Sequence, residues 1–204
     1  MSEMREVETP RGPARVHLDP GERGLLVLGH GAGGGPEAPD LLAAREGALA
    51  AGLSVARVEQ PWRVAGKRVA EAAPKLDEAW LAVIAQLQYD GTLVLGGRSS
   101  GARVACRTAT ELRASAVLAL AFPLVPPGRA TSRAHELALP TVPRLVVQGR
   151  RDTFGLPAES DGVSLHVVDG ADHSFAVRRQ DGRTRSEVLT EVRETVRDWL
   201  QTVT

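Results

Sequence analysis

The segment Thr92-Leu-Val-Leu-Gly-Gly-Arg-Ser-Ser-Gly101 joins an apolar run to a sharp turn and a helix-like segment, and it is the strongest indication of the fold. The residues before the turn predict a buried strand over 92–96, and those after it predict a helix over 100–112. The glycines on either side of the turn leave room for the chain to reverse around Ser99, whose backbone we expect to be strained. Such a G-x-S-x-G turn presents its serine at the end of a strand, so Ser99 is a candidate nucleophile.

Strands and helices alternate outward from this turn in both directions. The other expected strands of this pattern are at residues 24–28, 54–59, 116–122, 144–148 and 164–168. The other expected helices are at residues 40–51, 74–88 and 184–201, the first with Asp40 as its N-cap. Because parallel strands that alternate with helices are joined by right-handed crossovers, this pattern predicts an α/β fold. The expected architecture is a doubly wound, mostly parallel sheet with helices on both faces.

Length and composition predict one domain over residues 1–204. Of the 204 residues, 43% are hydrophobic, which suffices for one substantial core and is short for two. Residues 5–19 predict an antiparallel hairpin at the edge of the sheet. Residues 123–143 contain five prolines and predict a loop in place of a lid, with at most a short helix near 132–139.

The charges are balanced, with 25 Lys and Arg residues against 25 Asp and Glu residues and no block of five like charges. This distribution does not indicate a nucleic acid or a membrane as a partner. The chain has no apolar run of roughly the 18 residues that span a membrane and no signal-peptide core near its start, so we expect a cytoplasmic protein. Its one cysteine, Cys106, excludes an internal disulfide and is expected to be a buried core thiol.

Three residues that together can perform nucleophilic catalysis each follow an expected strand: Ser99, Asp152 and His173. Because ligands bind at the carboxyl ends of parallel strands, we expect these side chains to meet there. A serine hydroxyl needs a base that titrates near pH 7, and imidazole is such a base. A carboxylate then fixes the imidazole tautomer and stabilises its charged form. Asp172 competes with Asp152 for this role, but a residue adjacent to the base usually points elsewhere.

A glycine-rich loop, His30-Gly-Ala-Gly-Gly-Gly35, follows the expected strand at 24–28 and can bring main-chain donors close to a substrate carbonyl. The backbone N–H of Ser100, the residue after the nucleophile, is one expected oxyanion donor, and that of Ala32 is the other. His30 and Gly31 belong to the same predicted substrate-binding loop. We expect His30 to shape the loop by hydrogen bonding to backbone rather than to transfer protons.

These motifs resemble those of the α/β-hydrolase superfamily, whose catalytic residues follow the same Ser, Asp, His order along the chain. They are most similar to a compact, dienelactone-hydrolase-like branch that contains testis-expressed protein thirty and the third subunit of the NSL acetyltransferase complex. The resemblance implies Ser99 as nucleophile, Asp152 as acid and His173 as base, and it implies no particular substrate. The matching segments are His30-Gly-Ala-Gly-Gly, Gly97-Arg-Ser-Ser-Gly-Ala-Arg103, Phe122-Pro-Leu-Val-Pro-Pro-Gly128, Gln148-Gly-Arg-Arg-Asp-Thr-Phe-Gly155 and Gly170-Ala-Asp-His-Ser-Phe175.

The favoured function is therefore a serine hydrolase that cleaves a small carboxylic ester or related acyl compound, with no cofactor. One alternative is a non-catalytic scaffold with a hydrolase fold, because a fold alone does not establish activity. A second is dinucleotide binding, because Gly29-His-Gly-Ala-Gly-Gly34 fits G-x-G-x-x-G and Glu59 ends the next expected strand. Against it, the helix after these glycines is expected only at about residue 40.

The remaining polar residues have less specific interpretations. Arg98 and Arg103 flank the serine and are expected on a solvated helix face, with recognition of an anionic substrate as the alternative. The other histidines, His17, His135 and His166, lack a partner pattern and are expected to be structural or on the surface. No group of histidine, cysteine and carboxylate residues has the spacing of a metal site, so no metal is predicted.

Overall fold

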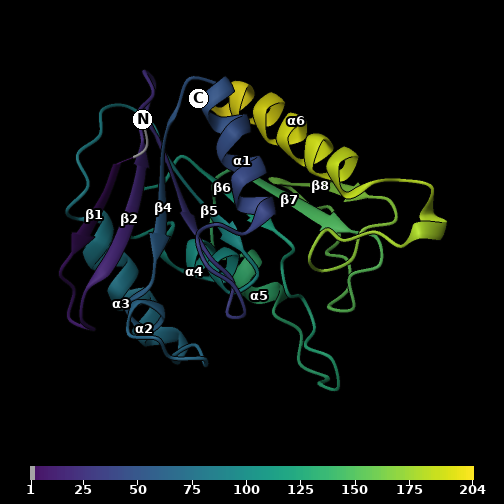
Figure 1. The fold of residues 1–204 in the computed structure, drawn as a ribbon, viewed down its shortest axis with the longest axis horizontal. Coiled ribbons are helices and arrows are strands. Elements are labelled where there is room, and N and C mark those ends of the chain that lie inside the picture. The colour runs from purple at the N-terminus through teal and green to yellow at the C-terminus, as the bar shows by residue number, and fades with distance from the viewer. Residues whose placement is uncertain (1–2) are drawn as a thin grey trace.

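The computed structural model describes residues 3–204 (Figure 1). The strands within these residues form one eight-stranded sheet. From edge to edge the strand order is β1-β2-β4-β3-β5-β6-β7-β8. Residues 1 and 2, which the predicted domain includes, lie outside the described residues. The strands are β1 Glu3–Val7, β2 Ala14–Asp19, β3 Leu25–Gly29, β4 Ser54–Glu59, β5 Leu93–Arg98, β6 Ala116–Leu120, β7 Arg144–Gly149 and β8 Val163–Val168.

The sheet is parallel from β4 to β8 and antiparallel only at its N-terminal edge. Strands β1 and β2 pair with each other antiparallel, and β2 pairs antiparallel with β4. All other neighbours pair in parallel, with β3 between β4 and β5. The predicted α/β fold with a mostly parallel sheet is therefore confirmed.

Helices cover both faces of the sheet, as Figure 1 shows. Helices α1 and α6 lie side by side on one face, and α3 and α4 pack against the other. The helices are α1 Pro39–Ala50, α2 Pro61–Val64, α3 Ala73–Ile84, α4 Ser100–Thr108, α5 Ala134–Leu137 and α6 Arg185–Val203. A single turn of 3-10 helix spans Arg179–Asp181 ahead of α6.

The two layers of helices explain why the central strands are apolar without alternation. In β3, Val27 points to the core that contains Trp80 of α3, and Leu28 points to the core that contains Val192 of α6. Successive side chains of a strand face opposite sides of the sheet, so a strand covered on both sides must be apolar throughout. All five residues of β3 are buried.

Several element boundaries differ from the predictions, and two of the differences bear on the site. Helix α1 begins at Pro39 with Ala38 as the flanking residue, so the prediction that Asp40 caps this helix is wrong. Strand β5 runs to Arg98 instead of ending at 96, which carries the extended chain directly to Ser99. Helices α3 and α4 end four residues earlier than predicted, at Ile84 and Thr108.

Sequence reasoning missed the short helix α2, which begins at Pro61 directly after β4. Proline is well suited to the first position of a helix, because its fixed φ fits the helix and its missing N–H would have no partner there. The helix buries Trp62 against the ring of His30, with the ring centroids 5.5 Å apart. Helix α2 therefore packs against His30, the first residue of the glycine-rich loop.

Between residues 3 and 204, no helix combines the length and the apolar character needed to cross a membrane.

Candidate active site

Ser99 lies in a strained turn between β5 and α4. Its backbone has φ 52° and ψ −108°, a conformation that L residues rarely adopt and that costs about 1–3 kcal/mol. The Ser99 N–H donates a hydrogen bond of 2.9 Å to the carbonyl of Leu120 at the end of β6. The surrounding fold thus holds the serine in a conformation that the isolated chain would avoid.

The glycines around Ser99 allow α4 to pack directly on β3. A Cβ atom on Gly97 would lie 2.5 Å from the carbonyl oxygen of Gly29, and one on Gly101 would lie 2.1 Å from the same oxygen. Both distances are shorter than any van der Waals contact, and the clash is with backbone, which cannot move aside as a flexible side chain can. The G-x-S-x-G pattern is thus a packing requirement of this turn.

We expect Gly101→Ala to destabilise the protein strongly, by about 1–3 kcal/mol or more, because its methyl group would push α4 away from β3. Thermal unfolding followed by circular dichroism measures this loss. Gly34→Ala is the matched control, since a Cβ atom there meets nothing within 4 Å. Equal melting temperatures for the two variants would contradict the packing argument.

The structure brings Ser99, His173 and Asp152 into one hydrogen-bonded chain. The Nε2 atom of His173 lies 3.1 Å from the Ser99 hydroxyl oxygen, and its Nδ1 atom lies 2.8 Å from Oδ2 of Asp152. His173 comes from the turn after β8, and Asp152 from the turn after β7. The ring of Phe154 packs against the imidazole with the centroids 4.4 Å apart, which restricts the movement of His173.

The Asp152 carboxylate is fully buried and accepts hydrogen bonds at both oxygens. Oδ1 accepts from the backbone N–H of Phe154 at 2.9 Å, and Oδ2 accepts from the side-chain amide of Gln148 at 2.8 Å as well as from His173. A buried carboxylate is costly unless such donors satisfy it. The network therefore satisfies the carboxylate oxygens of Asp152 and fixes their orientation beside the imidazole.

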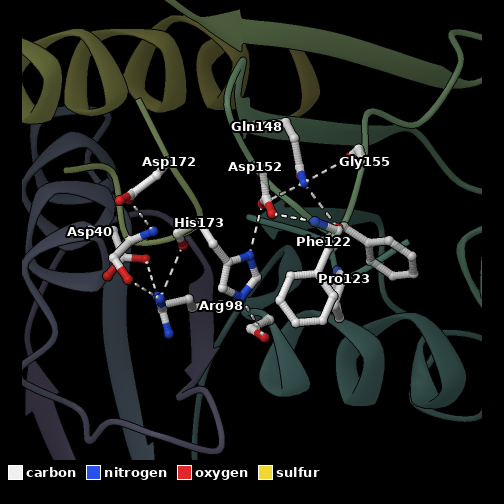
Figure 2. Close-up of polar contacts among 12 residues, drawn as sticks. Asp40, Arg98, Phe122, Pro123, Gln148, Asp152, Gly155, Asp172 and His173 are labelled. Carbon is white, nitrogen blue, oxygen red and sulfur yellow. Dashed lines mark hydrogen bonds and ion pairs between the residues drawn. The ribbon is translucent and has the colours of Figure 1, made fainter. Parts of the chain in front are cut away.

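Gln148 is a member of the site that sequence reasoning did not single out. Its side chain is fully buried, and the amide nitrogen lies 3.0 Å from the Phe122 carbonyl and 3.0 Å from that of Gly155, in addition to Asp152 (Figure 2). Its position four residues before Asp152, at the end of a buried strand, is the only sequence signal that could have indicated it. Gln148 connects the acid to the loops on both sides.

Asp172, the competitor of Asp152, has another role. Its Oδ1 atom accepts hydrogen bonds from the backbone N–H groups of Ser174 and Ala176, at 2.8 and 3.0 Å. These bonds close the turn that carries His173. Phe175 in the same turn has φ 53°, so the turn, like that of Ser99, includes a residue in the left-handed region.

His30 is buried and holds the glycine-rich loop by two hydrogen bonds. Its Nδ1 atom lies 2.9 Å from the Gly31 carbonyl, and its Nε2 atom lies 3.1 Å from the backbone N–H of Gln60. Nε2 must accept and Nδ1 must donate, so the ring is neutral with its proton on Nδ1. Because a trans peptide directs its C=O and N–H to opposite sides, fixing the Gly31 carbonyl directs the Ala32 N–H away from His30.

Burial lowers the pKa of His30 below its ordinary value of 6.5, which agrees with a neutral ring. We therefore expect the unfolding free energy to fall as the pH drops below about 6.5, because the unfolded chain then binds a proton that the folded chain rejects. The contribution of His30 is complete above that pH and is lost on acidification down to its folded pKa. Urea denaturation between about pH 8 and pH 5 measures this effect against the variant His30→Gln. The stability gap between the two proteins should narrow with acid, and a gap that is constant or widens would contradict the assignment.

Neither arginine beside the serine is a solvated residue, contrary to prediction. Arg103 makes two hydrogen bonds to the Glu136 carboxylate of α5, at 2.5 and 2.7 Å. Arg98 forms an ion pair with the buried Asp40 and donates to the His173 main chain. Arg103 therefore joins two helices, and Arg98 joins segments of the site itself.

The other singled-out residues lie elsewhere in the fold. His166 on β8 lies 2.8 Å from the Glu191 carboxylate of α6, a partner that the sequence did not indicate. Cys106 is buried in the core, which raises the pKa of its thiol to about 12. Helix α1 begins only at Pro39, whereas a dinucleotide-binding fingerprint needs a helix to open at its third glycine, here Gly34.

A cavity of about 590 Å³ opens between the glycine-rich loop and the His173 turn. Arg98 and Ser174, which are the neighbours of Ser99 and His173 in the chain, both line it, whereas Ser99 and His173 themselves do not. Its wall is polar as well as apolar, with the charged side chains of Glu59, Arg63 and Arg185. A ligand bound there would meet charged groups.

Comparison with known proteins agrees with this architecture. A family model described as an alpha/beta hydrolase domain matches residues 22–201. The chain therefore belongs to the alpha/beta hydrolase family. No curated protein matches the chain.

Solved structures of low sequence identity share the fold across nearly the whole chain. One is an α/β serine hydrolase without a lid from Xanthomonas campestris, 21% identical, with a TM-score of 0.71, covering 97% of this chain and 94% of that one. A serine hydrolase homologue from Coxiella burnetii is 20% identical, with a TM-score of 0.70 and 97% of both chains covered. Est1E from Butyrivibrio proteoclasticus, solved with ferulic acid bound, is 16% identical, with a TM-score of 0.74 and 98% of both chains covered.

Proposed function

We propose that this protein is a serine hydrolase that cleaves a small carboxylic ester or a related acyl compound. The observation that carries the proposal is the hydrogen-bonded chain from Ser99 through His173 to Asp152, with distances of 3.1 and 2.8 Å. The strained backbone of Ser99 adds support, because strain of this kind persists where the surrounding structure enforces it and often serves a function. A scaffold that only binds partners has no need of this arrangement.

The geometry supports an acyl-enzyme mechanism in two halves. His173 Nε2 removes the proton of the Ser99 hydroxyl as its oxygen attacks the substrate carbonyl, and Asp152 stabilises the imidazolium that forms. The protonated His173 then donates to the leaving alcohol, which departs and leaves an ester on Ser99. In the second half His173 activates a water molecule, which attacks this ester and releases the acid.

Two backbone N–H groups are proposed to bind the oxyanion of the tetrahedral intermediates. Ser100 is the first residue of α4, where an N–H has no partner within the helix and the helix dipole favours negative charge. Ala32 supplies the second N–H from the glycine-rich loop, in the peptide whose carbonyl His30 holds. Donors fixed before the reaction cost no reorganisation when charge develops, which makes this term large.

We further propose that the chain belongs to the compact, dienelactone-hydrolase-like branch of the family. The motifs around His30, Ser99, Asp152 and His173 support this assignment. The connection between β6 and β7 supports it too, since its one helix is the four-residue α5. Without a larger insertion there, the site has no apolar lid to cover a long acyl chain.

Hydrolysis of nitrophenyl esters tests the proposed function. We expect the acetate and butyrate esters to be cleaved with an initial burst of nitrophenol, which reports an acyl-enzyme. We expect the palmitate ester to be cleaved at least about tenfold more slowly in kcat/KM, because the short connection between β6 and β7 would leave most of a long apolar chain exposed to water. A preference for palmitate, or no hydrolysis of any of the three, would contradict the proposal.

A further inference from the structure

Arg98, the last residue of β5, contacts two loops that the proposed mechanism uses. Its Nη2 atom donates to the main-chain carbonyl of His173 at 3.0 Å and to the Ser174 hydroxyl at 3.1 Å. Its Nη1 atom lies beside the glycine-rich loop, where a Cβ atom on Gly31 would come within 2.8 Å of it. One guanidinium thus joins the strand that carries Ser99 to the turn that carries His173, and it lies beside the loop proposed to bind the oxyanion.

Asp40 pairs with the same guanidinium through its Nε atom, as Figure 2 shows. Its Oδ2 atom lies 2.8 Å from Arg98 Nε, and 3% of the Asp40 side chain is exposed against 13% of the Arg98 side chain. The Nε–H is not aligned on the oxygen, so the contact is an ion pair rather than a directed hydrogen bond. Burial raises the pKa of Asp40, and the positive charge of Arg98 opposes that rise.

Stability alone does not explain a charge pair at this place. Removing two charges from water costs several kcal/mol, and apolar residues of the same size often stabilise a protein as well or better. Elsewhere in the chain, partly buried arginines join helix to helix, as Arg107 of α4 does with Asp77 of α3. The Arg98–Asp40 pair differs because Arg98 also donates a hydrogen bond to the main chain of His173, the proposed base.

Asp152 binds the imidazole of His173 at Nδ1, and the ring of Phe154 packs against it. The position of Nε2 relative to Ser99 also depends on where the His173 main chain lies, and Arg98 binds that main chain directly. Errors of about 1 Å in the placement of reacting groups can reduce a rate by about 100-fold. A fixed His173 main chain therefore helps to keep Nε2 within reach of the Ser99 proton.

We propose that Arg98, held by Asp40, is a positioning residue that fixes the His173 main chain relative to Ser99 and the oxyanion loop. This inference rests on the proposed hydrolase function. Arg98 acts through His173 and does not itself need to touch the substrate. Its loss should therefore lower kcat and change KM little.

The decisive variant is the double substitution Asp40→Leu with Arg98→Met, which replaces the ion pair by apolar side chains of similar size. Arg98→Met alone would strand a buried carboxyl group and destabilise the fold, whereas the double variant leaves no uncompensated charge. We expect the double variant to melt close to the wild type and to have a kcat lower by about 10- to 100-fold. The control is the matched double substitution Asp77→Leu with Arg107→Met, which removes the partly buried ion pair between α3 and α4 and should leave kcat unchanged.

A second readout does not require turnover. The Nδ1 proton of a histidine bound to a carboxylate gives a low-field proton NMR signal. We expect that of His173 to be present in the wild type and in the control variant at Asp77 and Arg107. It should be broadened or lost in the double variant, because the ring no longer has one fixed position. A double variant with wild-type kcat and an intact signal would overturn the inference.

The two readouts separate this inference from the proposed function. If the wild type cleaves no ester, the hydrolase proposal fails, and the NMR signal still decides whether Arg98 positions His173. A signal lost in the double variant then supports positioning, and a signal retained overturns it. If the wild type is active and the double variant is equally active, the positioning role alone is wrong.

Discussion

Ser99→Ala is expected to lower kcat/KM for a short-chain nitrophenyl ester by about 1,000-fold or more. Alanine removes the proposed nucleophile, the Ser99 hydroxyl oxygen that lies 3.1 Å from His173 Nε2. Its side chain is nearly the same size as that of serine, so the turn between β5 and α4 should keep its backbone. The residual rate would come from the oxyanion donors and from substrate binding. Steady-state hydrolysis by purified wild-type and variant proteins measures the loss.

The control for this variant is Ser164→Ala, which changes an exposed serine on β8. It should keep the wild-type rate, and circular dichroism should give the same melting temperature for all three proteins within a few degrees. A Ser99→Ala protein that kept the wild-type rate would show that another group attacks the ester, and the catalytic assignment would be wrong.

Asp152→Asn is expected to reduce kcat by about 10,000-fold. Asp152 accepts from three donors: His173, Gln148 and the Phe154 N–H. An asparagine side chain has one oxygen and one NH₂ group, so in either orientation a donor would face a donor. The simplest relief is for His173 to move its proton to Nε2, and then it can no longer remove the Ser99 proton.

Asp172→Asn provides the matched comparison, because it changes the neighbouring carboxylate. The asparagine oxygen can still accept from Ser174 and Ala176, so the turn should stay closed and kcat should stay within about tenfold of the wild type. The reverse result, with Asp172→Asn inactive and Asp152→Asn active, would assign the acid to Asp172. Steady-state rates of the two variants near pH 8 decide between them.

The elements of the fold were predictable because strong local patterns specify them. A strand such as residues 25–28 is buried on both faces of the sheet. The sequence shows this directly, because apolar residues there do not alternate with polar ones. The meeting of Ser99, Asp152 and His173 was also predictable from the sequence. Each follows an expected strand, and the carboxyl ends of parallel strands lie at the same edge of a sheet. Helix ends were less predictable, since the last turn of a helix is marginal and packing decides it.

The support of the site was not predictable, because it depends on contacts between distant segments. Arg98 and Asp40 are separated by 58 positions in the chain, and nothing in either local pattern indicates that they meet. Asp40 has the appearance of a helix cap, and only the structure shows that its side chain turns inward. Gln148 was equally hidden, because a glutamine at the end of an apolar strand has no local signature of its role.

Labelling of the native protein with a fluorophosphonate probe, followed by peptide mapping, tests whether Ser99 is an activated nucleophile. The probe bonds covalently to a serine only where a base and an oxyanion site activate it. We expect one adduct per chain, on Ser99, that is absent in Ser99→Ala and formed much more slowly in Asp152→Asn. An adduct on a different serine, or no adduct on the folded wild-type protein, would contradict the claim that Ser99 is an activated nucleophile.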